Sequence, residues 1–256
     1  MKDVLTALLL TAIAGLSTGI GGLTAFFSKK MNTKFLSFTL GISAGVMIYI
    51  SFAELFVKAV DGLSQIYGAK SGNIINAVAF FGGIGLVAAV DRLIPEGSCM
   101  ETGKKDSGLM RTGVITAVAL AVHNFPEGMA TFVSALQSPA FAIPIVVAIA
   151  IHNIPEGIAV AVPIYYATGN KWKAFWYSLL SGLTEPLGAI IGYLILLPFM
   201  NDTLNYIVFS AVAGIMVFIS VDELLPAAQG YGEHNLSILG LVAGMVVMAV
   251  SLIGFL

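Results

Sequence analysis

A six-residue polar motif occurs twice near the middle of this chain, inside two of its most apolar stretches. HNFPEG covers residues 123–128 and HNIPEG covers residues 152–157. In each copy the histidine and the glutamate are four positions apart, which places both on one face of a helix. The proline between them removes a helical hydrogen bond and pushes against the carbonyl group four residues earlier. Each copy therefore predicts a helix that kinks at a cluster of imidazole, amide and carboxylate groups.

A third carboxylate follows the same pattern, because Glu185 precedes Pro186 in another apolar stretch that contains no Lys or Arg. A charge at the centre of a bilayer costs at least about 2.5–3.5 kcal/mol on insertion scales. A divalent cation would compensate these acids best, since imidazole nitrogen and carboxylate oxygen bind zinc, iron, manganese and cobalt. A hydrogen-bonded polar kink and a proton path are the alternatives.

The same residues argue against an enzyme, which needs a different arrangement of groups. The zinc-protease signature HExxH has two histidines on one helical turn, whereas this chain has His-Asn-x-Pro-Glu. The third histidine, His234, stands alone, and Cys99 is the single cysteine, so neither a zinc–cysteine cluster nor an internal disulfide can form. We predict no enzymatic activity, no cofactor and no nucleic-acid partner.

The elements that carry these motifs are predicted to be membrane-spanning helices. Charged residues make up 10% of the chain, against about 25% in soluble domains, and the mean hydropathy is +0.95. A helix needs about 20 apolar residues to cross a bilayer. We therefore predict an all-α integral membrane protein with a single domain over 1–256. Its eight spans lie at about 4–27, 35–57, 74–93, 112–136, 141–166, 174–198, 205–226 and 236–256.

The basic residues predict how these spans are oriented. Nine of the twelve lie in the loops after spans 1, 3 and 5, and three lie on the opposite side. Because basic loops stay in the cytoplasm, both termini are expected on the extracytoplasmic side of the plasma (inner) membrane. The nine residues are Lys29, Lys30, Lys34, Arg92, Lys104, Lys105, Arg111, Lys171 and Lys173.

Two pairs of segments resemble each other across the chain. AGVMIYISFAEL at 44–55 matches AGIMVFISVDEL at 213–224, and GLSTGIG at 15–21 matches GLTEPLG at 182–188. The two copies would cross the membrane in opposite directions, which indicates an inverted repeat. Both HNxPEG motifs lie between the copies, about halfway through their spans. Glu54 and Glu223 are counterparts, and we predict that they line an outer and an inner vestibule; ordinary interfacial carboxylates are the alternative.

The eight spans, the paired motifs and the Glu-Pro on span 6 together resemble the ZIP (Zrt/Irt-like) metal transporter family over essentially the whole chain. The length and His152 resemble its bacterial ZupT-like branch most. The resemblance implies uptake of divalent metal into the cytoplasm, chiefly zinc, with iron, manganese, cobalt and cadmium as further substrates. It also implies a 3+2+3 arrangement, with helices 1–3 and 6–8 around central helices 4 and 5, and a homodimer. A proton- or cation-conducting channel that uses the same carboxylates is the alternative.

By motif position, the resemblance implies two neighbouring metal sites on spans 4, 5 and 6. The first would take His123, Glu127 and Glu156. The second would take Asn124, Asn153, Glu185 and the same two glutamates, with His152 adjacent. Met47 falls where some members of the family place a ligand on span 2. The loop after span 3 departs from many eukaryotic members, because it contains no histidine.

Overall fold

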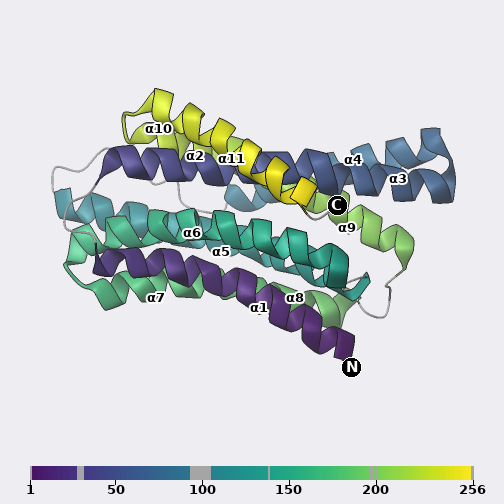
Figure 1. Ribbon diagram of the computed structural model, residues 1–256, viewed down its shortest axis with the longest axis horizontal. Helices are drawn as coiled ribbons and strands as arrows, with labels where there is room; N and C mark the ends of the chain where they lie inside the picture. The colour runs from purple at the N-terminus through teal and green to yellow at the C-terminus, as the bar shows by residue number, and fades with distance from the viewer. Residues whose placement is uncertain are drawn as a thin grey trace.

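The protein is described by a computed structural model that covers residues 2–27, 32–92, 105–137, 139–196, 199 and 201–254. Nearly all of these residues are helical, as predicted. The long helices lie side by side along one axis, and the start of α1 and the end of α11 point toward the same end of the bundle (Figure 1). This position of the two termini is consistent with eight spans, because a chain that crosses a membrane an even number of times has both termini on the same side.

The predicted spans correspond to single helices or to consecutive helices in the structure. The elements are α1 (Lys2–Gly22), η1 (Leu23–Phe26), α2 (Thr33–Ile50), η2 (Ser51–Leu55), α3 (Phe56–Tyr67), α4 (Ala69–Asp91), α5 (Lys105–Gln137), α6 (Pro139–Thr168), α7 (Lys171–Gly182), α8 (Thr184–Leu196), α9 (Asp202–Ile219), η4 (Ser220–Leu224), α10 (Leu225–Gly230) and α11 (His234–Gly254). Seven helical stretches of the described chain are long and apolar enough to cross a membrane. The eighth predicted span is α5, whose 33 residues reach about 50 Å at 1.5 Å per residue.

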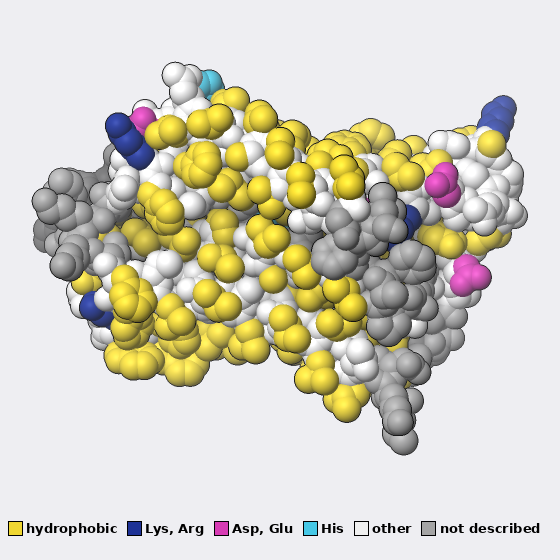
Figure 2. All heavy atoms as spheres, viewed as in Figure 1, with side chains coloured by type: hydrophobic (Ala, Val, Ile, Leu, Met, Phe, Trp, Pro, Cys, Tyr) yellow, Lys and Arg dark blue, Asp and Glu magenta, His cyan; other side chains and the backbone are white. Residues whose placement is uncertain are grey.

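The outer surface is that of a protein surrounded by lipid. Large apolar side chains such as Phe81, Leu194 and Ile253 are about two-thirds exposed. Figure 2 shows hydrophobic side chains over the middle of one face, with the charged side chains near its two ends. An apolar area of this extent is unfavourable in water and favourable in a bilayer. The chain is therefore a multi-pass membrane protein.

Span 2 is longer than predicted. Its helix does not end at residue 57 but continues through η2 and α3 to Tyr67, and Gly68, with a φ of +79°, makes the turn into α4. The extension forms because α3 is amphipathic and buries Ala59 and Leu63 against neighbouring helices. Glu54 therefore lies inside a continuous helix rather than near its end. Span 7 likewise continues to Gly230.

Of the three prolines next to the acids of the predicted metal site, only one interrupts its helix. α5 and α6 continue through Pro126 and Pro155, where bending stays a prediction. Span 6, by contrast, is divided at Leu183 into α7 and α8. Pro186 has no N–H to donate to the Gly182 carbonyl group, so the regular helical hydrogen bond cannot form there. The break lies next to Glu185.

The two similar halves of the sequence share an unusual local structure. η2 and η4 are both π-helices, and they occupy corresponding positions in the repeat. In each, a serine donates to a methionine carbonyl group four residues earlier at 2.7 Å, Ser51 to Met47 and Ser220 to Met216. The packing is paired in the same way, since α2 packs on α11 and α9 on α4, while α1 packs on α6 and α8 on α5. Single π-turns within α-helices often occur at functional sites.

Glycines bring the helices of the central region into direct backbone contact. A Cβ atom on Gly128 of α5 would overlap the Glu185 carbonyl oxygen of α8. One on Gly157 of α6 would overlap the Thr18 carbonyl oxygen of α1. Both glycines end an HNxPEG motif, so the close contacts lie directly beside the polar residues. Small residues permit this approach in membrane helices, where van der Waals packing drives association.

Candidate metal site

The polar side chains of the two motifs and Glu185 are buried together at the centre of the bundle. They come from α5, α6 and α8, and each is at most 2% exposed: Asn124, Glu127, His152, Asn153, Glu156 and Glu185. His123 lies in α5, but its side chain is outside the described part of the structure. Three carboxyl groups removed from water need compensating partners, because burying an uncompensated charge is very costly. The contacts of these side chains show how the site is built.

The two motifs meet across the α5–α6 interface. His152 Nε2 lies 3.0 Å from Glu127 Oε1. Spacing within one helix placed His152 on the same face as Glu156, and the structure adds a contact of His152 with the acid of the other motif while keeping its charge interaction with Glu156. An imidazole and a carboxylate in contact between two helices form a pair of potential ligands at one point, and imidazole nitrogen with carboxylate oxygen is a common zinc donor pair.

Both asparagines direct their amide nitrogens toward other groups and leave their carbonyl oxygens available. Asn124 Nδ2 donates to the Ser181 carbonyl oxygen at 3.1 Å, beside the break between α7 and α8. Asn153 Nδ2 donates to Glu185 Oε1 and to the Ala14 carbonyl oxygen, the latter at 3.1 Å. Neither Oδ1 atom has a hydrogen-bond partner among the described residues, and the same holds for Glu185 Oε2. These three oxygens are acceptors that a cation could use.

Ser43 is a member of the site that sequence analysis missed. Its hydroxyl group donates to Glu156 Oε1 at 3.0 Å, and both side chains are fully buried. Ser43 thereby brings α2 into contact with the acidic group of α6. The sequence contained a signal for this role. Ser43 precedes Met47, a predicted ligand position, by four residues and therefore lies on the same face of the helix.

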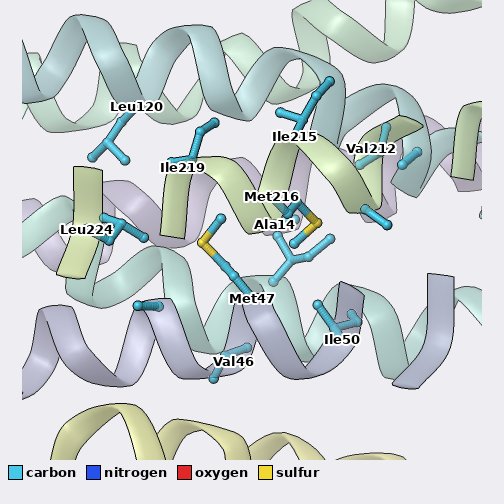
Figure 3. Close-up of a cluster of buried hydrophobic side chains, with 14 of the residues drawn as sticks. Ala14, Val46, Met47, Ile50, Leu120, Val212, Ile215, Met216, Ile219 and Leu224 are labelled. Carbon is cyan, nitrogen blue, oxygen red and sulfur yellow. The ribbon is translucent and has the colours of Figure 1, made fainter. Parts of the chain in front are cut away.

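The three further predicted residues have different surroundings. Met47 is fully buried in an apolar cluster with Ile50 of its own helix and Met216 of α9 (Figure 3). Glu54 forms an ion pair with Lys58, one turn further along the chain. Glu223, in η4, is close enough to Glu156 for a direct charge interaction. Glu223 is thus one of the charges that act on the central acid Glu156.

Some of the described donor groups contact each other, as His152 does with Glu127 and Asn153 with Glu185, and the set is not arranged around one point. Among the side chains that the structure describes, no three His, Cys, Asp or Glu residues form a group that could hold a metal ion. The His123 side chain is not part of this set. The donors comprise one imidazole, three carboxyl groups and two amide oxygens, which suits zinc, iron or manganese better than copper(I). A bound cation would take the place of contacts such as His152–Glu127.

A cavity leads toward this site from the end of the bundle where α3 meets α9. Its volume is about 250 Å³, and its lining includes Lys58, Asp61 and Tyr206. A second cavity of about 10 Å³ adjoins Glu127 and shares Leu55, Ser134 and Ile145 with the first. A volume of this size holds about one water molecule. We call the larger cavity the outer vestibule, because it lies at the end of the bundle that the distribution of basic residues predicts to be outside; the residues that line both cavities separate it from the one beside Glu127.

Comparisons with known proteins agree with this picture. The family model described as "ZIP Zinc transporter" matches residues 91–252. The zinc transporter ZupT of Clostridium perfringens is 57% identical over an alignment that covers 100% of this chain and 98% of the relative. ZupT of Streptococcus mutans is 58% identical, over 100% and 99% of the two chains. ZupT of Oceanobacillus iheyensis is 56% identical, over 99% of each.

Proposed function

This chain belongs to the ZIP family of zinc transporters, and from that membership we propose that it takes up Zn²⁺ into the cytoplasm through the buried site on α5, α6 and α8. ZIP proteins are membrane transporters and not enzymes. The observation that carries the proposal is the contact between the two motifs, in which His152 of α6 meets Glu127 of α5 at 3.0 Å. Such a pair, buried between two membrane helices, provides zinc ligands away from bulk water.

We propose two neighbouring ions that share carboxylates. One would take His123, Glu127 and Glu156, and the other would take Asn124, Asn153, Glu185 and the same two glutamates, with His152 adjacent. The available Oδ1 atoms of both asparagines support the second set. Fe²⁺, Mn²⁺, Co²⁺ and Cd²⁺ are proposed as further substrates, since the same donor types bind them.

We also propose the 3+2+3 arrangement, in which α5 and α6 stand between two inverted repeats. The matching π-helices and the paired packing of the outer helices support it. Transporters built in this way bind substrate near the midplane and expose it to each side in turn by moving one part of the protein against the other. The outer vestibule would then be the approach from outside, and Glu223 would lie on the inner path. The homodimer stays a prediction from the resemblance.

Purified protein in vesicles that contain a zinc-sensitive dye tests the transport proposal. We expect zinc influx that saturates with zinc concentration in the absence of a pH gradient, because substrate must occupy a limited number of sites. The alternative channel predicts something different: a proton or monovalent-cation flux without any divalent metal, which Glu127→Gln abolishes. That flux, together with the absence of saturable zinc influx, would replace the transporter proposal.

The orientation is tested by thiol labelling of intact cells. In a Cys99→Ser background, Ala69→Cys lies at the turn between α3 and α4, and Asn170→Cys lies at the turn between α6 and α7; both positions are exposed. Because basic residues concentrate at the end of the bundle that contains Asn170, we expect an impermeant reagent outside the cell to label only Ala69→Cys. Asn170→Cys should react after permeabilisation. The reverse pattern would contradict an extracytoplasmic location of both termini.

A further inference from the structure

The outer vestibule contains a basic residue on the approach that we propose for a cation. Lys58 and Asp61 of α3 both line this cavity. The Lys58 ammonium group forms an ion pair with Glu54, four residues earlier, across the end of the π-helix η2. A positive charge at this place would repel an incoming Zn²⁺ ion, so a simple attracting funnel of carboxylates does not account for it.

The ion pair acts on the cavity through Lys58, which lines it and holds the Glu54 carboxylate directly behind. The side chains of Lys58 and Glu54 are 35% and 20% exposed, so both are partly buried. Partly buried charges are screened by salt much less than charges on an open surface. The charges of Glu54, Asp61 and Lys58 add up to −1. Without the lysine, the two carboxylates alone would carry −2.

We propose that Lys58 is a tethered competitor cation, which occupies Glu54 until a divalent ion displaces it. The lysine is attached one helical turn away, so its effective concentration at Glu54 is high. A monovalent ion such as Na⁺ brings no more charge than the ammonium group and does not displace it. A divalent ion gains about twice the Coulomb attraction at the same distance and does so. Lys58 thus sets the preference for divalent over monovalent cations in the vestibule, and this role rests on the proposed uptake function.

Zinc uptake into vesicles by a Lys58→Gln variant tests this role. At low ionic strength we expect the apparent KM for zinc to fall about three- to tenfold, because the competitor is gone and the cavity is more negative. The maximal rate should not change. Raising NaCl from about 10 to about 150 mM should increase KM more in Lys58→Gln than in the wild type, because sodium now competes for Glu54 and screens the charge.

Three controls separate this role from simpler effects. Lys70→Gln removes the same charge from an exposed position outside the vestibule lining and should leave KM unchanged. Lys58→Arg keeps the charge and should behave like the wild type. Glu54→Gln combined with Lys58→Gln should cancel most of the gain in affinity.

The outcomes are distinguishable. An unchanged KM and salt response in Lys58→Gln, alongside normal wild-type uptake, would overturn the role of Lys58 alone. Equal shifts in Lys58→Gln and Lys70→Gln would show a general surface-charge effect, and a loss of maximal rate without a change in KM would show a structural role. Absence of saturable zinc uptake by the wild type would instead overturn the proposed function.

Discussion

Replacement of Glu156 by alanine is expected to abolish zinc uptake and to remove both bound ions from the purified protein. Glu156 is fully buried and is held by the Ser43 hydroxyl group at 3.0 Å. In the proposed site it is shared by both ions, so its loss leaves the other ligands of each ion incomplete. We expect the transport rate to fall at least about 100-fold, because each lost charged ligand costs several kcal/mol. Glu127→Ala should have the same effect.

Glu185→Ala is the matched control for that result, because Glu185 is equally buried but touches only the second proposed ion. This variant should keep one ion per chain and show weakened uptake or an altered metal preference. In all variants that bind metal, affinity should decrease as the pH falls, since histidine and carboxylate ligands must be deprotonated. Metal counting on purified protein, together with uptake assays, gives the answer. Wild-type protein that saturates at one ion per chain would contradict the shared pair.

A single added methyl group at Gly128 should also have a large effect. The Cβ atom of Gly128→Ala would overlap the carbonyl oxygen and Cα atom of Glu185, which belong to the backbone of α8 and cannot rotate away. α5 and α8 must therefore separate, which moves Glu127 away from Glu185. Overpacking of this kind costs about 1–3 kcal/mol, occasionally more. We expect a lower thermal unfolding temperature in detergent and little zinc uptake.

Gly85→Ala is the matched control, because Gly85 is also inside a helix but has no atom within 4 Å of an added Cβ. Its stability should stay equal or rise slightly, since alanine favours the helix by about 1 kcal/mol. Gly128→Ala protein that unfolds at the wild-type temperature and transports zinc normally would contradict a close α5–α8 contact at the site.

The membrane character of the protein could be predicted from its sequence. Composition and the length of the apolar stretches determine that the chain crosses a bilayer as helices. In lipid, backbone N–H and C=O groups must bond to each other, and a helix does this within one segment. The constant rise of a helix determines depth, so His123 and His152 could be placed near the middle of their spans. Similarity between 44–55 and 213–224 was also visible, and both segments do end in a π-helix. The family could be recognised from the paired motifs.

The partners of individual side chains could not be predicted in this way. Helical spacing correctly placed His152 near Glu156, but it did not predict the contact of His152 with Glu127 of the other motif. The contact of Ser43 with Glu156 and the ion pair of Lys58 with Glu54 were not predicted, and the end of span 2 was predicted too early. Helical periodicity describes which groups share a face of one helix and says nothing about the helix that this face meets.

The face of a helix on which a residue lies, and the break beside Pro186, depend on the chain within one helix. The sequence by itself therefore determined the shared face of His and Glu in each motif and the interruption of span 6. Contacts between helices depend on how closely two backbones approach. The approach is decided by glycines such as Gly128 and Gly157 together with the atoms opposite them on α8 and α1. Those opposite atoms are far away along the chain. The tertiary structure alone therefore decided that Glu127 meets His152, that Asn153 meets Glu185, and that α2 reaches the central acids through Ser43.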